Sequence, residues 1–353
     1  MNMTESTRYR EIEVSGTPRE LGRQIGEAAR QEVRGFCDIA LERVNKTVNI
    51  SHDKAMGIAR ECTQLARDYS PDMVEELEGT AESSGVSLDQ LMLLQVRNQF
   101  TNEPESGCTS FSLAASATTI NSALIGQNWD NDPELDQFNV VLKRRPTGKP
   151  ANMTITQAGL IAYVGVNNAG MGVCLNTLPA PSRPIGVPHY FTVRGIYEAD
   201  SLEGAVQAVS RAARAVPANI MLSTPQGPFD LEVTIDDVHV LGTGDPIVTH
   251  TNHCVHPDLV AINNDFPELI ESQPRKQRID SCIAASTGLD VEAMQATLSD
   301  HDNYPRSICR HPNDDEGTGF WTSVFSVVID ATNAKMHLTR GTPCNHPYEE
   351  YVL

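Results

Sequence analysis

The chain has 353 residues, of which 46 are acidic and 27 basic, giving a formal net charge of −19. Such a surface repels phosphate backbones and anionic lipid, so we expect no nucleic acid or membrane-surface partner. No apolar run approaches the length of a membrane span, and residues 1–16 lack the basic and apolar regions of a signal peptide. The eight cysteines are scattered and form no CxxC pair, which favours a reduced, cytoplasmic protein.

The first hundred residues have a helical pattern. Residues 17–20 (TPRE) combine a capping threonine, a proline suited to the first helical position and a glutamate that can complete a capping box. Apolar residues then recur at helical spacing over 20–44. Gly22 and Gly26, four residues apart, predict close packing against a neighbouring element. Residues 70–71 (SP) open a further helix.

The pattern changes at residue 108, where short segments rich in β-branched and aromatic residues begin. Predicted strands cover residues 108–114, 123–129, 138–146, 153–166, 172–178, 189–195, 219–224, 229–235, 239–242, 323–331 and 335–341. Helices are predicted over 201–216 and about 275–300. This order of helices and strands favours one compact α+β unit with two sheets and helices outside them, rather than a strictly alternating parallel fold.

Cys108 begins the first predicted strand and follows Gly107. A cysteine at such a position is ordinarily a small buried hydrophobe. The preceding glycine, however, allows close approach to the peptide bond that joins the two residues. The thiol could attack the Gly107 carbonyl, and water would resolve the resulting thioester. Cleavage would free an α-amine on Cys108 that titrates near pH 8 in reference peptides and could act as the base for its own thiol.

Three further charged residues have both a structural and a functional interpretation. Asp130 follows Trp129 in an Asn- and Asp-rich stretch typical of a turn, but it could instead accept a hydrogen bond from the freed Cys108 amine. Arg306 and Arg310 flank an acidic loop, where surface charge pairing is the default interpretation. The functional alternative is a buried guanidinium near the amine or the substrate.

Residues 249–259 (THTNHCVHPDL) contain three histidines and a cysteine that could act as metal ligands: His250, His253, His256 and Cys254. Three hypotheses remain open for this segment. The histidines could bind a metal ion, or one of them could be the base of a Cys–His dyad with Cys108. In the third hypothesis Asn252 is the important residue, because its side-chain NH2 is a neutral donor for a developing oxyanion.

Several segments, taken in order, resemble the acyl-coenzyme A:6-aminopenicillanate acyltransferase family of N-terminal-nucleophile hydrolases. They are GTPRELGRQIGEAAR, GCTSF, GQNWD, GVNNAGMGVCLNTL, FTVRGIYEADSLEGAVQAV, FDLEVT, HTNH and TSVFSVVIDATNAKMHLTRGTPC. The resemblance implies a four-layer αββα core and an inactive precursor that cuts itself before the cysteine. Residues 1–107 would become an α subunit and residues 108–353 a β subunit.

The resemblance also implies roles for individual residues. Cys108 matches the nucleophile, Asp130 the aspartate that orients the amine, and Asn252 the oxyanion asparagine. Arg310 is the better match to the active-site arginine, with Arg306 as the alternative.

We therefore expect a cysteine amidohydrolase that cleaves small N-acyl or aminoacyl amides through an acyl-Cys108 thioester, without a cofactor or metal. Its partners would be the amide substrate and the two fragments of its own precursor, and a homo-oligomer is left open. An acyl-coenzyme A-dependent N-acyltransferase with the same nucleophile is the alternative, in which Lys143, Arg144 and Arg145 could supply a phosphate site. A metal-dependent hydrolase built on the 250–256 histidines and a catalytically silent binding protein are the remaining hypotheses.

Overall fold

The computed structural model describes residues 7–45, 48–100, 107–265, 272–315 and 319–353. Within these ranges the strands form two sheets, one of eight strands and one of six. The larger has the order β1 (Glu11–Gly16), β4 (Asn139–Pro146), β5 (Asn152–Gln157), β6 (Val164–Asn167), β7 (Gly172–Asn176), β8 (Ala218–Thr224), β9 (Gly227–Val233) and β10 (Val238–Leu241). The smaller has the order β11 (Ile247–His250), β2 (Gly107–Leu113), β3 (Leu124–Asn131), β12 (Thr322–Asp330), β13 (Lys335–Leu338) and β14 (Glu349–Val352).

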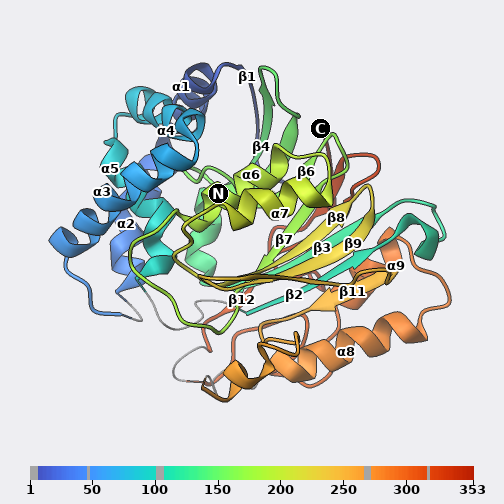
Figure 1. Cartoon of the computed structure of the whole chain (residues 1–353). Helices are drawn as coiled ribbons and strands as arrows, with labels where there is room; N and C mark the ends of the chain where they lie inside the picture. Colours follow the sequence, from blue (N-terminus) through green and yellow to red (C-terminus); the bar gives the residue numbers. More distant parts are fainter. Residues whose placement is uncertain (1–6, 46–47, 101–106, 266–271, 316–318) are drawn as a thin grey trace, which may run out of the picture.

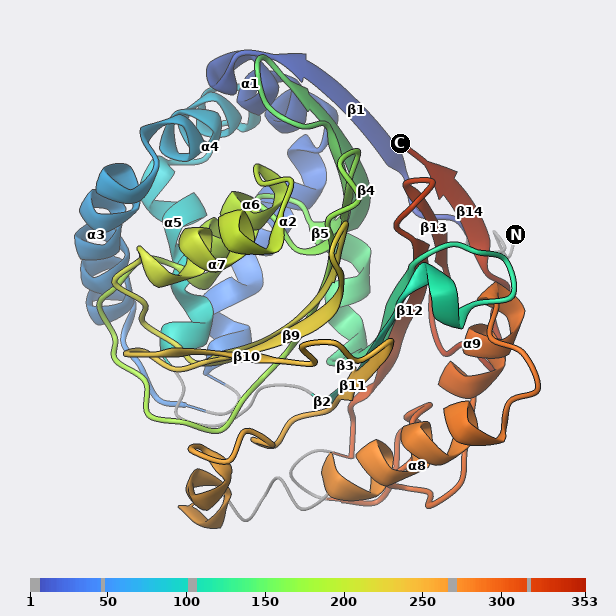
Figure 2. The ribbon, with the colours of Figure 1, turned by 45° about the vertical axis from the view of Figure 1, so that its right-hand side comes forward.

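Helices cover both outer faces of this pair of sheets (Figures 1 and 2). On the side of the larger sheet lie α1 (Pro18–Ala28), α2 (Arg30–Val44), α3 (His52–Tyr69), α4 (Pro71–Ser84), α5 (Leu88–Val96), α6 (His189–Tyr197) and α7 (Leu202–Ser210). On the side of the smaller sheet lie α8 (Ser272–Ala285) and α9 (Val291–Leu298). Short 3-10 helices span Arg97–Gln99, Ala115–Ala117, Pro133–Phe138 and Val260–Asp265. The four layers agree with the predicted αββα core.

Two apolar clusters hold the layers together. The larger cluster joins the N-terminal helices to the larger sheet and to the inner face of the smaller one. The smaller cluster packs α8 and α9 on the outer face of the smaller sheet, where Ile279 and Met294 meet Phe111 and Val328. Burial of this apolar area is the main stabilisation of such a layered fold.

The predicted close approach at Gly22 and Gly26 is confirmed, and the partner is α4. A Cβ atom on Gly22 would lie 1.9 Å from the backbone oxygen of Glu76, and one on Gly26 would lie 2.4 Å from that of Thr80. Any side chain on these faces would therefore force α1 away from α4. Because α1 begins with the predicted capping box between Thr17 and Glu20, the start of the helix is also confirmed.

Several predicted elements differ from the structure. The helix expected over 20–44 is interrupted at Ala29 and forms α1 and α2. The segment 189–195, expected to be a strand, is instead part of α6. Residues 190–197 of this helix are all buried, and in a short segment that is buried on every side the sequence pattern does not distinguish a helix from a strand. Strands β1 and β14 lie in segments with no strand prediction. In the described part of the chain, every helix is too short or too polar to cross a membrane.

Candidate active site

Cys108 lies at the start of β2, a central strand of the smaller sheet that pairs with β3 on one side and β11 on the other. In the β2–β3 register Gly107 is opposite Asp130 and Cys108 is opposite Trp129. Side chains alternate along a strand, so Cys108 shares its face with Ser112, whose hydroxyl donates to the Leu222 carbonyl of the larger sheet. The thiol therefore faces the interior between the sheets, and Cys108 is only 1% exposed.

Asn252 follows β11 and binds the backbone of Cys108. Its Oδ1 accepts the Cys108 N–H at 2.9 Å and an Arg275 Nη2–H at 2.8 Å. Its Nδ2 donates to the side-chain oxygen of Thr177 at 2.9 Å and to the carbonyl oxygen of that residue at 3.1 Å. The amide oxygen of Asn252 thus faces the nitrogen that cleavage would free, whereas the NH2 group predicted to stabilise an oxyanion faces Thr177.

Arg275, which the sequence analysis did not select, joins the same group. Its Nη1 donates to the Cys108 carbonyl oxygen and, at 2.9 Å, to Thr109 Oγ1. The side chain is buried, although it belongs to a charged segment of α8. The spacing of apolar residues could have indicated its burial. Arg275 precedes Ile279 and Ile283 by four and eight residues, which places it on the same, buried face of the helix.

Asp130 and Arg310 converge on the position of Gly107. A Cβ atom on Gly107 would lie 3.1 Å from Asp130 Oδ2 and 3.5 Å from Arg310 Nη1. Ser323 links the two residues, because its hydroxyl donates to Asp130 Oδ1 at 2.6 Å and accepts the Arg310 backbone N–H at 3.0 Å. The turn interpretation of Asp130 is wrong, since this residue is buried within β3.

Of the two arginines considered for the site, only Arg310 is placed for it. Arg310 is buried, and its guanidinium lies 5.6 Å from the centre of the Trp321 ring. Arg306 is exposed. The structure therefore brings together Gly107, Cys108, Asp130 and Arg310, with Asn252 bound to the Cys108 amide.

The histidines of the 250–256 segment do not form one metal-ligand set in the described part of the chain. His250 Nε2 faces Glu232 Oε1 at 2.9 Å, and its Nδ1 faces the Thr251 carbonyl at 2.8 Å. His253 Nδ1 faces the hydroxyl of Ser272 at 2.7 Å. His256 lies in a separate group with His239 and Asp258.

These surroundings also shift the pKa values of two of the histidines. Burial disfavours protonation of His250, but the nearby carboxylates of Asp230 and Glu232 outweigh it and raise the pKa of the imidazole. Burial lowers the pKa of His253 to about 4. The hydrogen bonds of these two rings go to groups other than Cys108, and His256 lies in its separate group, so the described residues contain no Cys–His dyad with Cys108.

Aromatic and thiol side chains surround the candidate nucleophile on its inner face. Trp129 packs edge-on against Tyr163, with ring centres 5.8 Å apart, and also against Phe325 at 5.1 Å. Burial raises the pKa of the Tyr163 phenol and of the Cys174 thiol well above their ordinary values, and proximity to Cys108 raises both further. These groups are therefore neutral near neutral pH and give the thiol an apolar environment.

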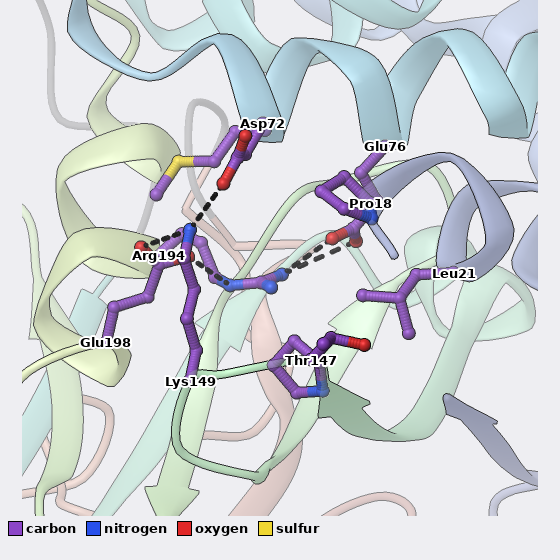
Figure 3. Close-up of a pocket in the computed structure, with 10 residues that line it drawn as sticks. Pro18, Leu21, Asp72, Glu76, Thr147, Lys149, Arg194 and Glu198 are labelled. Carbon is purple, nitrogen blue, oxygen red and sulfur yellow. Dashed lines mark hydrogen bonds and ion pairs between the residues drawn. The ribbon is translucent and has the colours of Figure 1, made fainter. Parts of the chain in front are cut away.

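A small pocket elsewhere in the molecule lies between α1, α4 and α6 and contains none of the four candidate residues (Figure 3). Its cations are paired with carboxylates: Arg194 with Glu76 at 3.0 Å, and Lys149 with Asp72 at 2.9 Å and Glu198 at 3.0 Å. The basic residues considered for a coenzyme phosphate are also paired.

In the basic segment 143–145, considered above for a coenzyme phosphate, Lys143 contacts Glu11 at 2.7 Å, and Arg145 contacts Glu13 at 2.7 Å. Arg144 is buried against Glu76 at 2.8 Å. An incoming phosphate would have to displace these carboxylates, so the three residues do not form a prepared phosphate site.

Two stacked sheets between helical layers, with a cysteine at the start of a central strand, agree with the N-terminal-nucleophile hydrolase fold that the sequence resemblance implies, and the chain is an enzyme with this fold. The model of the acyl-coenzyme A:6-aminopenicillanic acid acyl-transferase family matches residues 117–345. The chain is also 30% identical over 351 residues to the acyl-coenzyme A:6-aminopenicillanic-acid-acyltransferase 40 kDa form of Emericella nidulans, covering 97% of this chain and 95% of the relative. The chain therefore belongs to this family.

Solved structures with a similar arrangement share little sequence with it. Penicillin V acylase from Agrobacterium tumefaciens is 12% identical with a TM-score of 0.43, covering 65% of this chain and 82% of its own. A mutant of conjugated bile acid hydrolase from Clostridium perfringens is 11% identical with a TM-score of 0.43, covering 70% of this chain and 97% of its own.

Proposed function

We propose that the chain is a self-processing cysteine amidohydrolase that cleaves small N-acyl or aminoacyl amides through a thioester on Cys108. The observation that carries the proposal is the hydrogen bond from the Cys108 amide to Asn252, next to Asp130 and Arg310. Any buried backbone N–H needs an acceptor, so the hydrogen bond alone is not diagnostic. What distinguishes this one is its place at a Gly–Cys bond beside the buried side chains of Asp130, Arg310 and Arg275.

Processing would begin at the bond between Gly107 and Cys108. The Cys108 sulfur attacks the Gly107 carbonyl carbon, the C–N bond breaks, and the nitrogen takes up a proton. Water then hydrolyses the thioester, leaving a carboxylate on Gly107 and a free amine on Cys108. Residues 1–107 would remain attached, because β1 pairs in parallel with β4 and the N-terminal helices share the core of the larger sheet.

In the mature enzyme, the freed amine of Cys108 would accept the proton of its own thiol. The thiolate attacks the acyl carbonyl carbon, the substrate amine leaves with a proton, and water hydrolyses the acyl-enzyme. The oxygens of Asn252 and Asp130 would orient the amine, and Arg310 would lie next to the reacting group. An Asn252 donor for the oxyanion requires Nδ2 to turn from Thr177 towards the substrate.

Acyl transfer from a coenzyme A thioester is the second candidate function, because the relative from Emericella nidulans carries that activity in its name. The two activities share the acyl-enzyme and differ in the group that receives the acyl chain. The paired state of Lys143, Arg144 and Arg145 favours the hydrolase.

The test is a screen of small N-acyl and aminoacyl amides with matured protein, followed by mass spectrometry, with Cys108→Ala as the control. We expect release of a free acid without coenzyme A and trapping of the acyl group on Cys108. Product formation only when both an acyl-coenzyme A and an amine are supplied would establish the transferase instead. Equal hydrolysis by Cys108→Ala would overturn the assignment of the nucleophile.

A further inference from the structure

Two histidines and two cysteines meet at the edge of the smaller sheet, away from the 250–256 segment. Each offers one ligand atom, and all four atoms lie within 4.8 Å of one another: His301, Cys309, His311 and Cys344. His301 follows α9, Cys309 and His311 precede β12, and Cys344 lies between β13 and β14. None of these residues belongs to the hydrolase mechanism described above, and the cluster joins the segment 301–311 to Cys344, which lies 33 positions after His311.

Four of the six separations between the ligand atoms are close to the edges of a tetrahedral zinc site, and the two between His301 and the cysteines are within 4.8 Å. The two sulfurs are 3.7 Å apart, and the two Nε2 atoms of the histidines are 3.0 Å apart. His311 Nε2 lies 3.6 Å from Cys309 Sγ and 3.3 Å from Cys344 Sγ. With zinc bonds of about 2.3 Å to sulfur and about 2.05 Å to nitrogen, a tetrahedron has edges of about 3.8 Å (S–S), about 3.6 Å (S–N) and about 3.3 Å (N–N).

We propose that His301, Cys309, His311 and Cys344 bind one structural Zn²⁺ ion. Two thiolates and two imidazoles are a common ligand set for zinc, and four protein ligands leave no position for a substrate or a reactive water. Binding converts both thiols to thiolates and releases two protons to solvent, so the filled site is neutral. A disulfide between Cys309 and Cys344 would bring the sulfurs to about 2.05 Å and would give the two histidines no role.

The site would also position the candidate active-site arginine, because Arg310 lies between two of its ligands. The Arg310 backbone N–H donates to Ser323, whose hydroxyl in turn donates to Asp130. The Arg310 carbonyl accepts from the Ser323 N–H at 3.1 Å. Fixing the side chains on both sides of Arg310 therefore holds the segment that places Asp130 and Arg310 beside Gly107.

The first test measures metal content in protein purified without a histidine tag or chelator. We expect about one zinc per chain by inductively coupled plasma mass spectrometry. Cys344→Ser and His301→Ala should each lose most of this zinc. Because His301 is exposed, His301→Ala is expected to fold even if the cysteine variant does not, and it therefore keeps the experiment informative. Cys282→Ser and His256→Ala, outside the cluster, should retain it.

The second test removes zinc from wild-type protein with a chelator and titrates it back in weakly buffered solution containing a pH indicator. About two protons should be released per zinc bound, and Co²⁺ in the same site should give the visible bands of tetrahedral cobalt–thiolate coordination. The proposal is overturned if wild type binds no zinc in this titration, or if the cluster variants bind as much as wild type. A Cys309–Cys344 disulfide in unreduced peptide maps would overturn it as well.

Discussion

The backbone N–H of Cys108 donates a 2.9 Å hydrogen bond to Oδ1 of Asn252, a residue 144 positions later in the chain. The bond links the first residues of β2 to the segment after β11 and holds the nitrogen that self-cleavage would convert to an amine. Both residues are buried, so loss of either partner leaves the other group without a hydrogen bond and away from water, which costs free energy. The first two predictions concern the two partners of this bond.

Wild-type protein should consist of two fragments that meet at the bond between Gly107 and Cys108. Cys108→Ala should remain a single folded chain, because it lacks the sulfur that attacks the Gly107 carbonyl. Intact mass spectrometry measures both products and the position of the cut. Cleavage to the same extent in Cys108→Ala would point to an external protease and contradict self-processing.

Asn252→Ala should lower kcat of matured enzyme by on the order of a hundredfold or more, because it removes both the acceptor that holds the Cys108 nitrogen and the NH2 group that could turn towards the oxyanion. Asn252→Asp should be at least as harmful, because it introduces negative charge where negative charge develops. Steady-state kinetics on separately matured protein provide the measurement. If Asn252→Ala is fully active while alanine at His250, His253 and His256 abolishes activity, the 250–256 histidines are the functional residues.

Arg275→Met should slow processing or lower kcat/KM by roughly ten- to a hundredfold, since a buried charged hydrogen bond contributes about 1.5–3 kcal/mol. The guanidinium contacts Cys108, Thr109 and Asn252, so its loss loosens the nucleophile and its partner together. Lys276→Met is the matched control, because the neighbouring Lys276 pairs with Asp280 on the exposed face of α8. Equal effects of the two variants would assign Arg275 a general role in helix stability.

Asp130→Asn should shift the acidic limb of the kcat/KM profile to lower pH and reduce the plateau. A carboxylate next to the Cys108 amine favours the protonated amine and raises its pKa, so removing the charge lowers the pH at which the neutral base appears. Thiol and amine belong to one residue, and the apparent pKa is that of the pair. If neither the acidic limb nor the plateau of the kcat/KM profile changes, Asp130 has only a structural role, through its hydrogen bond with Ser323.

Glu76→Gln should reduce the free energy of unfolding by about 3–5 kcal/mol at pH 7, because it removes the carboxylate that pairs with buried Arg144 and leaves buried Arg194 only its 3.6 Å contact with Glu198. Burial opposes ionisation of Glu76, but the two arginines outweigh it and lower its pKa below 4.5. Its stabilisation is therefore present above about pH 4.5 and is lost as the pH falls through the folded-state pKa.

Denaturant unfolding of wild type, Glu76→Gln and Glu78→Gln at several pH values tests this prediction. Glu78 lies on the same helix and forms exposed ion pairs with Arg19 and Arg67, so Glu78→Gln should cost only about 0–1 kcal/mol. If wild type and Glu76→Gln lose stability in parallel on acidification, the buried carboxylate is not the group that titrates.

Local signals were sufficient where a residue's role depends on its immediate neighbours. The capping box at Thr17 and Glu20 and the change of pattern at Cys108 were visible without a structure, and so was the Gly107–Cys108 pair. These signals did not predict α6 correctly. This helix is buried on all sides, so its sequence has no alternation of apolar and polar residues at helical spacing, and its composition is that of a strand.

The layered α+β class, the candidate nucleophile and the family could be predicted from the chain alone, because they follow from the order of short segments along it. Which distant groups meet became clear only from the packing of the sheets and helices. In the structure Arg310 is buried at the site and Arg306 is exposed, and Arg275 is a further residue of the site. Asp130 lies in a buried strand rather than a turn, and the 250–256 histidines do not lie in one group. The physical reason is that such contacts span 20 to almost 200 positions and arise when sheets and helices pack, a process that leaves no local periodicity in the sequence.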